Sequence, residues 1–267
     1  MRERCAVSVQ GNLATLFEER AEPPADGEIA WYAARLPRGS GVVLDAIAGT
    51  GRLLVPLIDA GWQVHGAEAS ATMLARCRAR LERCGHTTEL FRQSVVALNL
   101  PFRYAAAFIA GGAFQLLVDP AAALDALLRL RAHLVEPALL LLDLFVPAGA
   151  EHPPGAAVVE VQAVTPLDGG RIGLRSETSF DVAQKRIDVV RRYERRDRQS
   201  IVEREDETVS LTWYSEEQAV ALLEAAGYCN VHIDSPPCAR EEGRRFAAIA
   251  RVGPDSSGRA GRTNLLT

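Results

Sequence analysis

The chain lacks both the positive charge and the lysine content of a typical nucleic-acid-binding protein. Its 30 Lys and Arg residues are outnumbered by 34 Asp and Glu residues, which leaves a net charge of −4. A protein that binds duplex nucleic acid usually presents a clustered cationic surface, so we expect no nucleic acid partner. Lys185 is the only lysine, and this dominance of arginine indicates the coding bias of a bacterial genome rich in G and C.

Long apolar runs and paired cysteines are also missing. The longest apolar run, 139–146, is interrupted by Asp143 and is far shorter than the roughly 20 residues that a membrane-spanning helix needs. The five cysteines match no CxxC pair and no zinc-ligand spacing, so we expect free thiols and no metal site. The N-terminus mixes Arg and Glu, unlike a signal peptide. We therefore expect a cytoplasmic protein with no membrane partner.

Short apolar strands and amphipathic helices alternate along the first 147 residues. We predict strands at 42–45, 62–67, 88–93, 106–110 and 138–145, and helices at 11–20, 26–36, 52–60, 71–84 and 120–134. The last of these helices is expected to turn Leu124, Leu127, Leu128 and Leu130 toward the core. Such an alternation is typical of a parallel sheet with helices on both faces.

The pattern changes to consecutive strands after Pro147. We predict strands at 157–164, 171–180, 186–196 and 200–212, rich in charge and poor in large apolar residues. These properties indicate an antiparallel sheet with one solvated face. A helix capped by Ser215 and two closing strands, 228–233 and 246–252, complete the chain.

A glycine turn follows the first strand of the alternating region. Asp45 ends that strand, Gly49-Thr50-Gly51 forms the turn, and Glu68 ends the next strand. Glycines at such a turn let a ligand approach the backbone closely, and an acid at the end of the second strand can accept hydrogen bonds from both ribose hydroxyls. The series predicts an adenosine-containing cofactor. The alternative is a tight turn with a solvated acid beside it. Leu54 stands where a dinucleotide-binding motif has its third glycine.

The segment VVLDAIAGTGRLLVPLIDAGWQVHGAEASATMLARCRARL resembles the cofactor-binding segment of class I S-adenosylmethionine-dependent methyltransferases that act on small molecules. PFRYAAAFIAGGAFQLL and LTWYSEEQAVALLEAAGY resemble later parts of the same family. The resemblance implies an α/β fold, Rossmann-like and doubly wound, with a mostly parallel seven-stranded sheet and an antiparallel β insertion after strand 5. We divide the chain into an N-terminal helical lid (1–40), a core (41–147 and 213–252), the insertion (148–212) and a flexible tail (253–267).

The resemblance also implies which residues hold S-adenosylmethionine. Asp45 would orient the turn and the methionine ammonium, and Glu68 would hold the ribose hydroxyls. The other implied cofactor-binding residues are Ile47, Ala48, Gly49, Thr50, Gly51, Ala69, Met73, Ser94, Val95, Ala110 and Gly111. Three residues depart from the family pattern. Ile47 stands where Gly or Ala is usual, Ser94 where Asp is usual, and Leu116 where many relatives have His.

Candidate substrate and catalytic residues surround the predicted cofactor site. His152 and Tyr32 are the catalytic candidates, and the substrate-binding candidates are Trp31, Gln115, Trp213 and Tyr214. Tyr32 and Trp31 could equally pack a helix on the sheet, and His152 could simply be solvated. Asp143, inside a buried strand, could be a structural hydrogen-bond acceptor. Methyl transfer from a sulfonium needs a base only when the nucleophile carries a proton at neutral pH.

A run of arginines in the predicted insertion has two readings. Its members are Arg191, Arg192, Arg195, Arg196 and Arg198. They could meet an acidic substrate, but pairing with Glu203, Glu205 and Glu207 on the neighbouring strand is the favoured interpretation.

We therefore expect methyl transfer to a nitrogen or oxygen of a small molecule, in a chain that could form a homodimer through its insertion. The rival hypothesis is a catalytically weakened or non-catalytic protein that binds S-adenosylmethionine or its demethylated product. Ala110-Gly111-Gly112-Ala113 lacks the N-P-P-Y/F type signature, which counts against methylation of a nucleic acid base or a glutamine amide.

Overall fold

The computed structural model describes residues 12–21, 23–39, 41–148, 157–166, 169–198, 200–236 and 243–253. His152 and nearly all of the tail predicted at 253–267 lie outside these residues. None of the described helices is long and apolar enough to cross a membrane.

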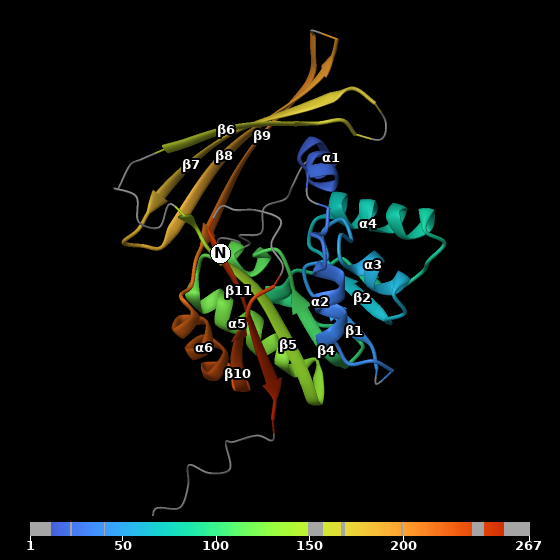
Figure 1. Cartoon of the computed structure of the whole chain (residues 1–267), viewed down its shortest axis with the longest axis vertical. Coiled ribbons are helices and arrows are strands. Elements are labelled where there is room, and N and C mark those ends of the chain that lie inside the picture. Colours follow the sequence, from blue (N-terminus) through green and yellow to red (C-terminus); the bar gives the residue numbers. More distant parts are fainter. Residues whose placement is uncertain are drawn as a thin grey trace, which may run out of the picture.

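Seven strands form one mixed sheet in the order β10-β11-β5-β4-β1-β2-β3 (Figure 1). They are β1 (Val43–Asp45), β2 (Val64–Ala67), β3 (Leu90–Phe91), β4 (Tyr104–Ile109), β5 (Leu134–Val146), β10 (Cys229–Asp234) and β11 (Arg244–Val252). Neighbours among the first five strands are parallel, whereas β11 is antiparallel to β5 and β10. The predicted Rossmann-like, mostly parallel seven-stranded sheet is thereby confirmed.

Helices cover both faces of this sheet, which is why β1 and β4 are buried along their whole length. One face carries α2 (Glu28–Arg35), α3 (Leu54–Asp59) and α4 (Ala71–Arg83). The other face carries α5 (Pro120–Ala132), α6 (Glu216–Ala225) and the 3-10 turns η1 (Val95–Ala97) and η2 (Ala113–Leu116). Side chains alternate between the two faces along each strand. Val43, Asp45 and Phe108 consequently point to the side of α2 and α3.

The helix boundaries have local causes. α3 begins at Leu54, so Pro56, which has no N–H to donate, falls in the first turn, where proline is tolerated. α6 begins after Ser215, whose capping box with Gln218 confirms the predicted cap. The prediction that Leu128 faces the core was wrong, since this side chain is 47% exposed. The small side chains of Ala123 and Ala126 are buried on α5 instead, where they allow a close approach to the sheet.

The region after β5 forms a second, antiparallel sheet in the order β6-β7-β8-β9. Its strands are β6 (Ala157–Val164), β7 (Arg171–Asp181), β8 (Arg186–Asp197) and β9 (Ser200–Thr212). The outward face is solvated, as predicted, and exposes Val161 and Val190. The inward face packs Ile172, Leu174 and Tyr193 against α1 (Asn12–Ala21).

α1 connects the antiparallel sheet to the core (Figure 1). The carboxylate of Glu205 on β9 accepts hydrogen bonds from the backbone N–H groups of Leu13 (2.8 Å) and Ala14 (3.3 Å). This acceptor satisfies the free donors at the beginning of the helix and complements its positive end. At the other end of α1, Glu19 forms ion pairs with arginines on α4. The first helix of the predicted lid is therefore docked on the insertion as well as on α4.

Candidate active site

The glycine turn after β1 forms in a conformation that requires glycine. Gly49 and Gly51 have φ angles of 56° and 78°, which are unfavourable for other residues. A Cβ atom at Gly51 would lie 2.7 Å from Cys77 Sγ on α4, so close packing also excludes a side chain there. The turn therefore allows a ligand that lies across the carboxyl ends of β1 and β2 to approach the backbone closely.

Glu68, at the end of β2, faces this turn directly. Its Oε2 accepts a hydrogen bond from Gly49 N (2.9 Å), and its Oε1 accepts one from Ser70 N (2.8 Å). The side chain is buried, and burial raises its pKa while the backbone N–H donors oppose that shift. The structure thus brings the predicted ribose-binding acid and the predicted turn into contact.

Asp45 is the last residue of β1, directly before the turn, and one of its carboxylate oxygens has no hydrogen-bond partner among the described residues. Burial and the nearby Glu68 raise the pKa of Asp45 to about 8, and Arg52 and the N–H of Ile47 oppose the shift. In the described part of the chain, Oδ1 has no hydrogen-bond partner. A buried acceptor without a partner is costly, so this atom favours a ligand that donates hydrogen bonds or carries positive charge.

A narrow, mainly apolar pocket extends from Glu68 to η2. It is lined by Ala46, Ile47, Glu68, Ala69, Gln93, Ser94, Val95, Ala113, Leu116 and Leu117. Five of these residues were predicted to bind the cofactor, and the three departures from the family pattern, Ile47, Ser94 and Leu116, all line it. Ser94 Oγ is buried and, within the described ranges, has no partner, so it is free to bond a ligand.

The remaining predicted cofactor residues lie close to the turn. Ala48 N donates to Ala67 O (2.9 Å), which ties the turn to β2, and Thr50 is buried. Met73 Sδ is 3.8 Å from the position of a Cβ on Gly49. Ala110 is half-buried at the end of β4, and Gly111 follows it.

Two charged pairs lie beside the glycine turn, and the sequence predicted neither of them. Glu28 on α2 accepts hydrogen bonds from Arg52 Nη1 (2.6 Å) and Nη2 (2.8 Å). Asp143 on β5 accepts from Gly111 N (2.9 Å) and from Arg245 Nη1 (3.1 Å). Glu28 belongs to no motif of the sequence. Its role is revealed only by its contact with Arg52, the residue that follows the glycine turn in the sequence.

Tyr32 and Trp31 lie on the face of α2 that covers the sheet. Tyr32 is fully buried, and its ring packs on Phe108 with 5.2 Å between centroids. The Trp31 ring carries the guanidinium of Arg35 at 4.0 Å on its face. Both residues pack the helix on the sheet. Tyr32 Oη and Trp31 Nε1 nevertheless have no hydrogen-bond partner among the described residues, so a ligand role for either stays a prediction.

Gln115 is engaged with backbone groups of two strands. Its Nε2 donates to Phe145 O (2.9 Å) and Thr212 O (2.7 Å), and its Oε1 accepts from Phe145 N (2.7 Å). A contact with a substrate would require these bonds to break. Gln115 therefore joins η2 to the ends of β5 and β9.

The two aromatic residues after β9 lie in different surroundings. Trp213 is buried with Ile187 and Val189 of the antiparallel sheet. Tyr214 packs on Phe114 of η2, with 6.0 Å between ring centroids, and burial raises its pKa to about 12. Tyr214 thus stands beside the pocket segment, whereas Trp213 supports the junction between the sheets.

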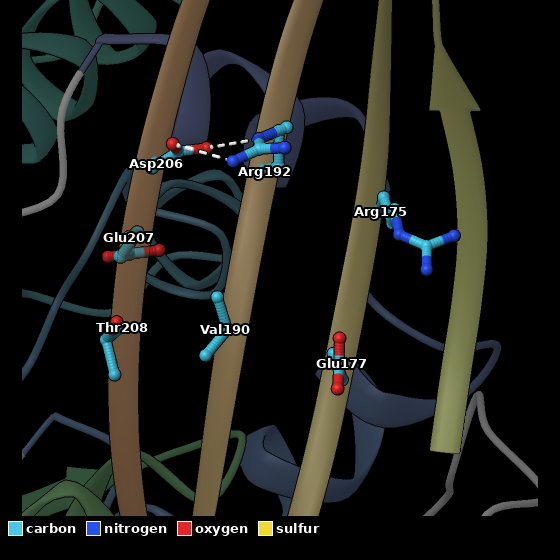
Figure 2. Close-up of a pocket in the computed structure, with 7 residues that line it drawn as sticks. All are labelled: Arg175, Glu177, Val190, Arg192, Asp206, Glu207 and Thr208. Carbon is cyan, nitrogen blue, oxygen red and sulfur yellow. Dashed lines mark hydrogen bonds and ion pairs between the residues drawn. The ribbon is translucent and has the colours of Figure 1, made fainter. Parts of the chain in front are cut away.

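A second hollow lies on the antiparallel sheet, over β7, β8 and β9 (Figure 2). It is lined by Arg175, Glu177, Val190, Arg192, Asp206, Glu207 and Thr208. Arg192 binds Asp206 through Nε (2.7 Å) and Nη2 (3.1 Å). Arg196 pairs with Glu194 on its own strand, and Arg191 pairs with Glu207. The arginine run is thus largely paired within the sheet, although Asp206 and Glu194 replace most of the predicted partners.

Comparison with known proteins identifies the domain that carries the glycine turn. Residues 43–136 match the family described as "Methyltransferase domain". This chain carries a methyltransferase domain. The match and the strand order confirm the expectation of a class I S-adenosylmethionine-dependent methyltransferase. No curated protein matches the methyltransferase by sequence.

Solved structures share the fold of the whole methyltransferase. An S-adenosylmethionine-dependent methyltransferase from Clostridium acetobutylicum has a TM-score of 0.73 at 15% identity, over 90% of this chain and 98% of its own. The CcbJ methyltransferase from Streptomyces caelestis has a TM-score of 0.73 at 20% identity, over 94% and 100%. The sugar N-methyltransferase KedS8 from Streptoalloteichus has a TM-score of 0.72 at 18% identity, over 95% and 100%. At these identities the likeness establishes the fold, including the antiparallel sheet.

Proposed function

We propose that the enzyme transfers the methyl group of S-adenosylmethionine to a nitrogen or oxygen atom of a small molecule. The observation that carries the proposal is the pair of buried carboxylates on either side of the glycine turn. Asp45 Oδ1 has no partner among the described residues and suits the methionine ammonium, and Glu68 faces the turn where ribose hydroxyls would lie. The apolar pocket with Ser94 Oγ suits an adenine ring.

These residues fit the cofactor. The reaction needs no nucleophile from the protein, because the acceptor itself attacks the methyl group. When bound, S-adenosylmethionine supplies an activated methyl group, so the protein's tasks are to orient the acceptor and to exclude water. Asp45 and Glu68 bind and orient, the turn allows close approach, and α2 covers the sheet with Trp31 and Tyr32.

The names of proteins with similar structures and the net charge of this chain support a small acceptor. One neighbour is named a sugar N-methyltransferase and another an amino pentose methyltransferase, the latter with a TM-score of 0.65 at 21% identity. The net charge of −4 argues against a nucleic acid acceptor. The homodimer and the lid remain predictions.

A second function, binding without catalysis, is favoured by Ile47. Its branched side chain lines the narrow pocket at the position where the family usually has Gly or Ala. Calorimetric titration with S-adenosylmethionine and with S-adenosylhomocysteine tests whether the protein binds the cofactor. We expect a Kd below about 1 mM for both ligands. Absence of binding at that concentration would contradict the proposed function, and tight binding without turnover on any acceptor would favour the second function.

A further inference from the structure

Asp143 is held in place through only one of its two carboxylate oxygens. Oδ2 accepts from Gly111 N and from Arg245 Nη1, whereas Oδ1 is buried and has no partner in the described ranges. Most buried polar atoms in proteins are paired, because a buried acceptor left without a partner costs about 1–3 kcal/mol. The free oxygen therefore points to a ligand.

Asp143 lies near the residue that follows the glycine turn, through its bond to Gly111. Arg52 follows the turn, and its Nη2 lies 3.8 Å from the position of a Cβ on Gly111, the residue that bonds Asp143. Asp143 also shares a sheet face with Asp45, since Leu139 and Leu141 of β5 pack on that face. A molecule beyond Gly111, next to a ligand on the turn, would meet Asp143.

Tyr32 provides a second free polar atom in the same region. Its Oη is buried and, in the part of the chain that is described, unpartnered. Tyr32 belongs to the same buried cluster as Leu139 and Leu141 of β5, on the sheet face that Asp143 shares, and its pKa is raised by burial first and then by the charge of Asp143. An ammonium group could donate to Asp143 Oδ1, and once it has given up a proton its nitrogen could accept from a neighbouring hydroxyl.

The surrounding charges favour a cation over a neutral hydroxyl. Four buried carboxylates, Asp45, Glu68, Asp143 and Glu28, are accompanied by two guanidinium groups, Arg52 and Arg245. Hydrogen bonds between ionised partners are about twice as strong as neutral ones. A protonated amine satisfies the oxygen through such a charge-assisted bond.

We propose that Asp143 binds the amino group of the acceptor and takes its proton, so that the enzyme is an N-methyltransferase for small molecules with a primary or secondary amine. This inference rests on the proposed function. The acceptor arrives as an ammonium and gives one proton to Asp143, which frees the nitrogen lone pair. The lone pair forms the N–C bond while the C–S bond of the sulfonium breaks and its electron pair remains on sulfur. The product leaves as a methylammonium ion, and the proton on Asp143 passes to solvent.

The first test measures binding of a matched amine and alcohol. Glucosamine and glucose are titrated calorimetrically into protein saturated with S-adenosylhomocysteine. We expect wild type to bind glucosamine at least about tenfold more tightly than glucose, because only the amine forms a charge-assisted bond. Asp143→Asn keeps an acceptor for Gly111 N but loses the charge, so the preference should disappear while affinity for S-adenosylhomocysteine stays unchanged. Asp125→Asn, at an exposed ion pair on α5, is the control and should behave like wild type.

The second test measures turnover by the release of S-adenosylhomocysteine. The amine substrates are ethanolamine and glucosamine, and the matched alcohols are ethylene glycol and glucose. The rate with amines should exceed that with alcohols and fall about a hundredfold in Asp143→Asn. Equal binding of amine and alcohol, or a preference for amine that survives in Asp143→Asn, overturns the inference while leaving the proposed function intact. Failure to bind S-adenosylhomocysteine overturns the proposed function itself. If Asp143→Asn does not fold, Arg245→Gln replaces it: amine preference should be retained or increased, and its loss overturns the inference.

Discussion

The carboxylate of Glu68 accepts a hydrogen bond from the backbone N–H of Gly49 at 2.9 Å. This bond links the end of β2 to the glycine turn after β1. Ser70 N occupies the other oxygen, so Glu68 also joins the turn to the beginning of α4. The residue that we propose to bind ribose therefore shapes the turn as well, and its two roles can be separated experimentally.

Replacement of Glu68 by Gln should weaken cofactor binding more than it weakens the fold. The amide retains one acceptor, but its NH2 group faces a backbone N–H and cannot bond it. We expect the calorimetric Kd for S-adenosylhomocysteine to rise about 10–100-fold, the range for loss of a hydrogen bond to a charged group. Glu82→Gln, on the exposed side of α4, is the control. An unchanged Kd in Glu68→Gln would contradict the ribose-binding role.

Gly51→Ala should destabilise the protein more than Gly85→Ala does. Both glycines have positive φ, 78° and 73°, so both substitutions carry the same backbone strain of about 1 kcal/mol or more. At Gly51 the new Cβ would also lie 2.7 Å from Cys77 Sγ, whereas nothing lies within 4 Å at Gly85. The midpoints of urea unfolding measure the difference, which reports packing alone. Equal midpoints would show that α4 can move away from the turn without cost.

Stability should fall as the pH rises from about 4 to 8, and Asp45→Asn should reduce this fall. The folded-state pKa of Asp45 is about 8, because burial and Glu68 raise it against Arg52, whereas an unfolded Asp titrates near about 4. The folded protein therefore binds more protons than the unfolded chain in this window, and the free energy of unfolding decreases with pH.

Differential scanning calorimetry between pH 5 and 8.5 tests this dependence. Asp45→Asn removes the buried charge, so its Tm should exceed that of wild type by roughly 5 °C at pH 8 and match it at pH 5. Glu68 and Asp143, whose pKa values are raised in the same direction, keep part of the slope in the variant. A Tm of Asp45→Asn below that of wild type at pH 8 would contradict the assignment. The exposed Asp125→Asn should leave the profile unchanged.

Gln115→Ala should act on stability before it acts on substrate binding. The substitution removes the buried side chain that pairs with the N–H and C=O of Phe145 and the C=O of Thr212, two half-buried residues. We expect a loss of about 2–4 kcal/mol in the free energy of unfolding, measured in urea. Gln63→Ala, at an exposed position before β2, should cost less than about 0.5 kcal/mol. A change in KM without a loss of stability would restore the substrate role.

The sequence predicts the order of elements well because periodicity and turn residues are local properties. The alternation of strands and helices, the glycine turn and Glu68 all fall where they were expected. Contacts between distant segments were not predictable in the same way. Glu28 and Arg52 are 24 positions apart and belong to elements whose relative position depends on the packing of α2 over the sheet. Gln115, 97 positions from Thr212, looked like a ligand-binding residue for the same reason.

Side-chain surroundings were also less predictable than element type. Leu128 was expected in the core because Leu is usually buried, yet the buried stripe of α5 passes through Ala123 and Ala126. The single free oxygen of Asp143 depends on Arg245 and Gly111 taking the other one, which no local pattern reveals.

Glu19 has a consequence for the design of shorter forms of this protein. Its carboxylate is the shared counter-ion of three arginines on α4, with Arg83 at 3.0 Å, Arg80 at 3.7 Å and Arg76 at 3.9 Å. A truncation that removes α1 would leave three like charges along successive turns of one helix, and their mutual repulsion would act on the helix whose first turn contacts the glycine turn. Removal of α1 would therefore disturb the proposed cofactor site indirectly, because the unpaired arginines would destabilise α4.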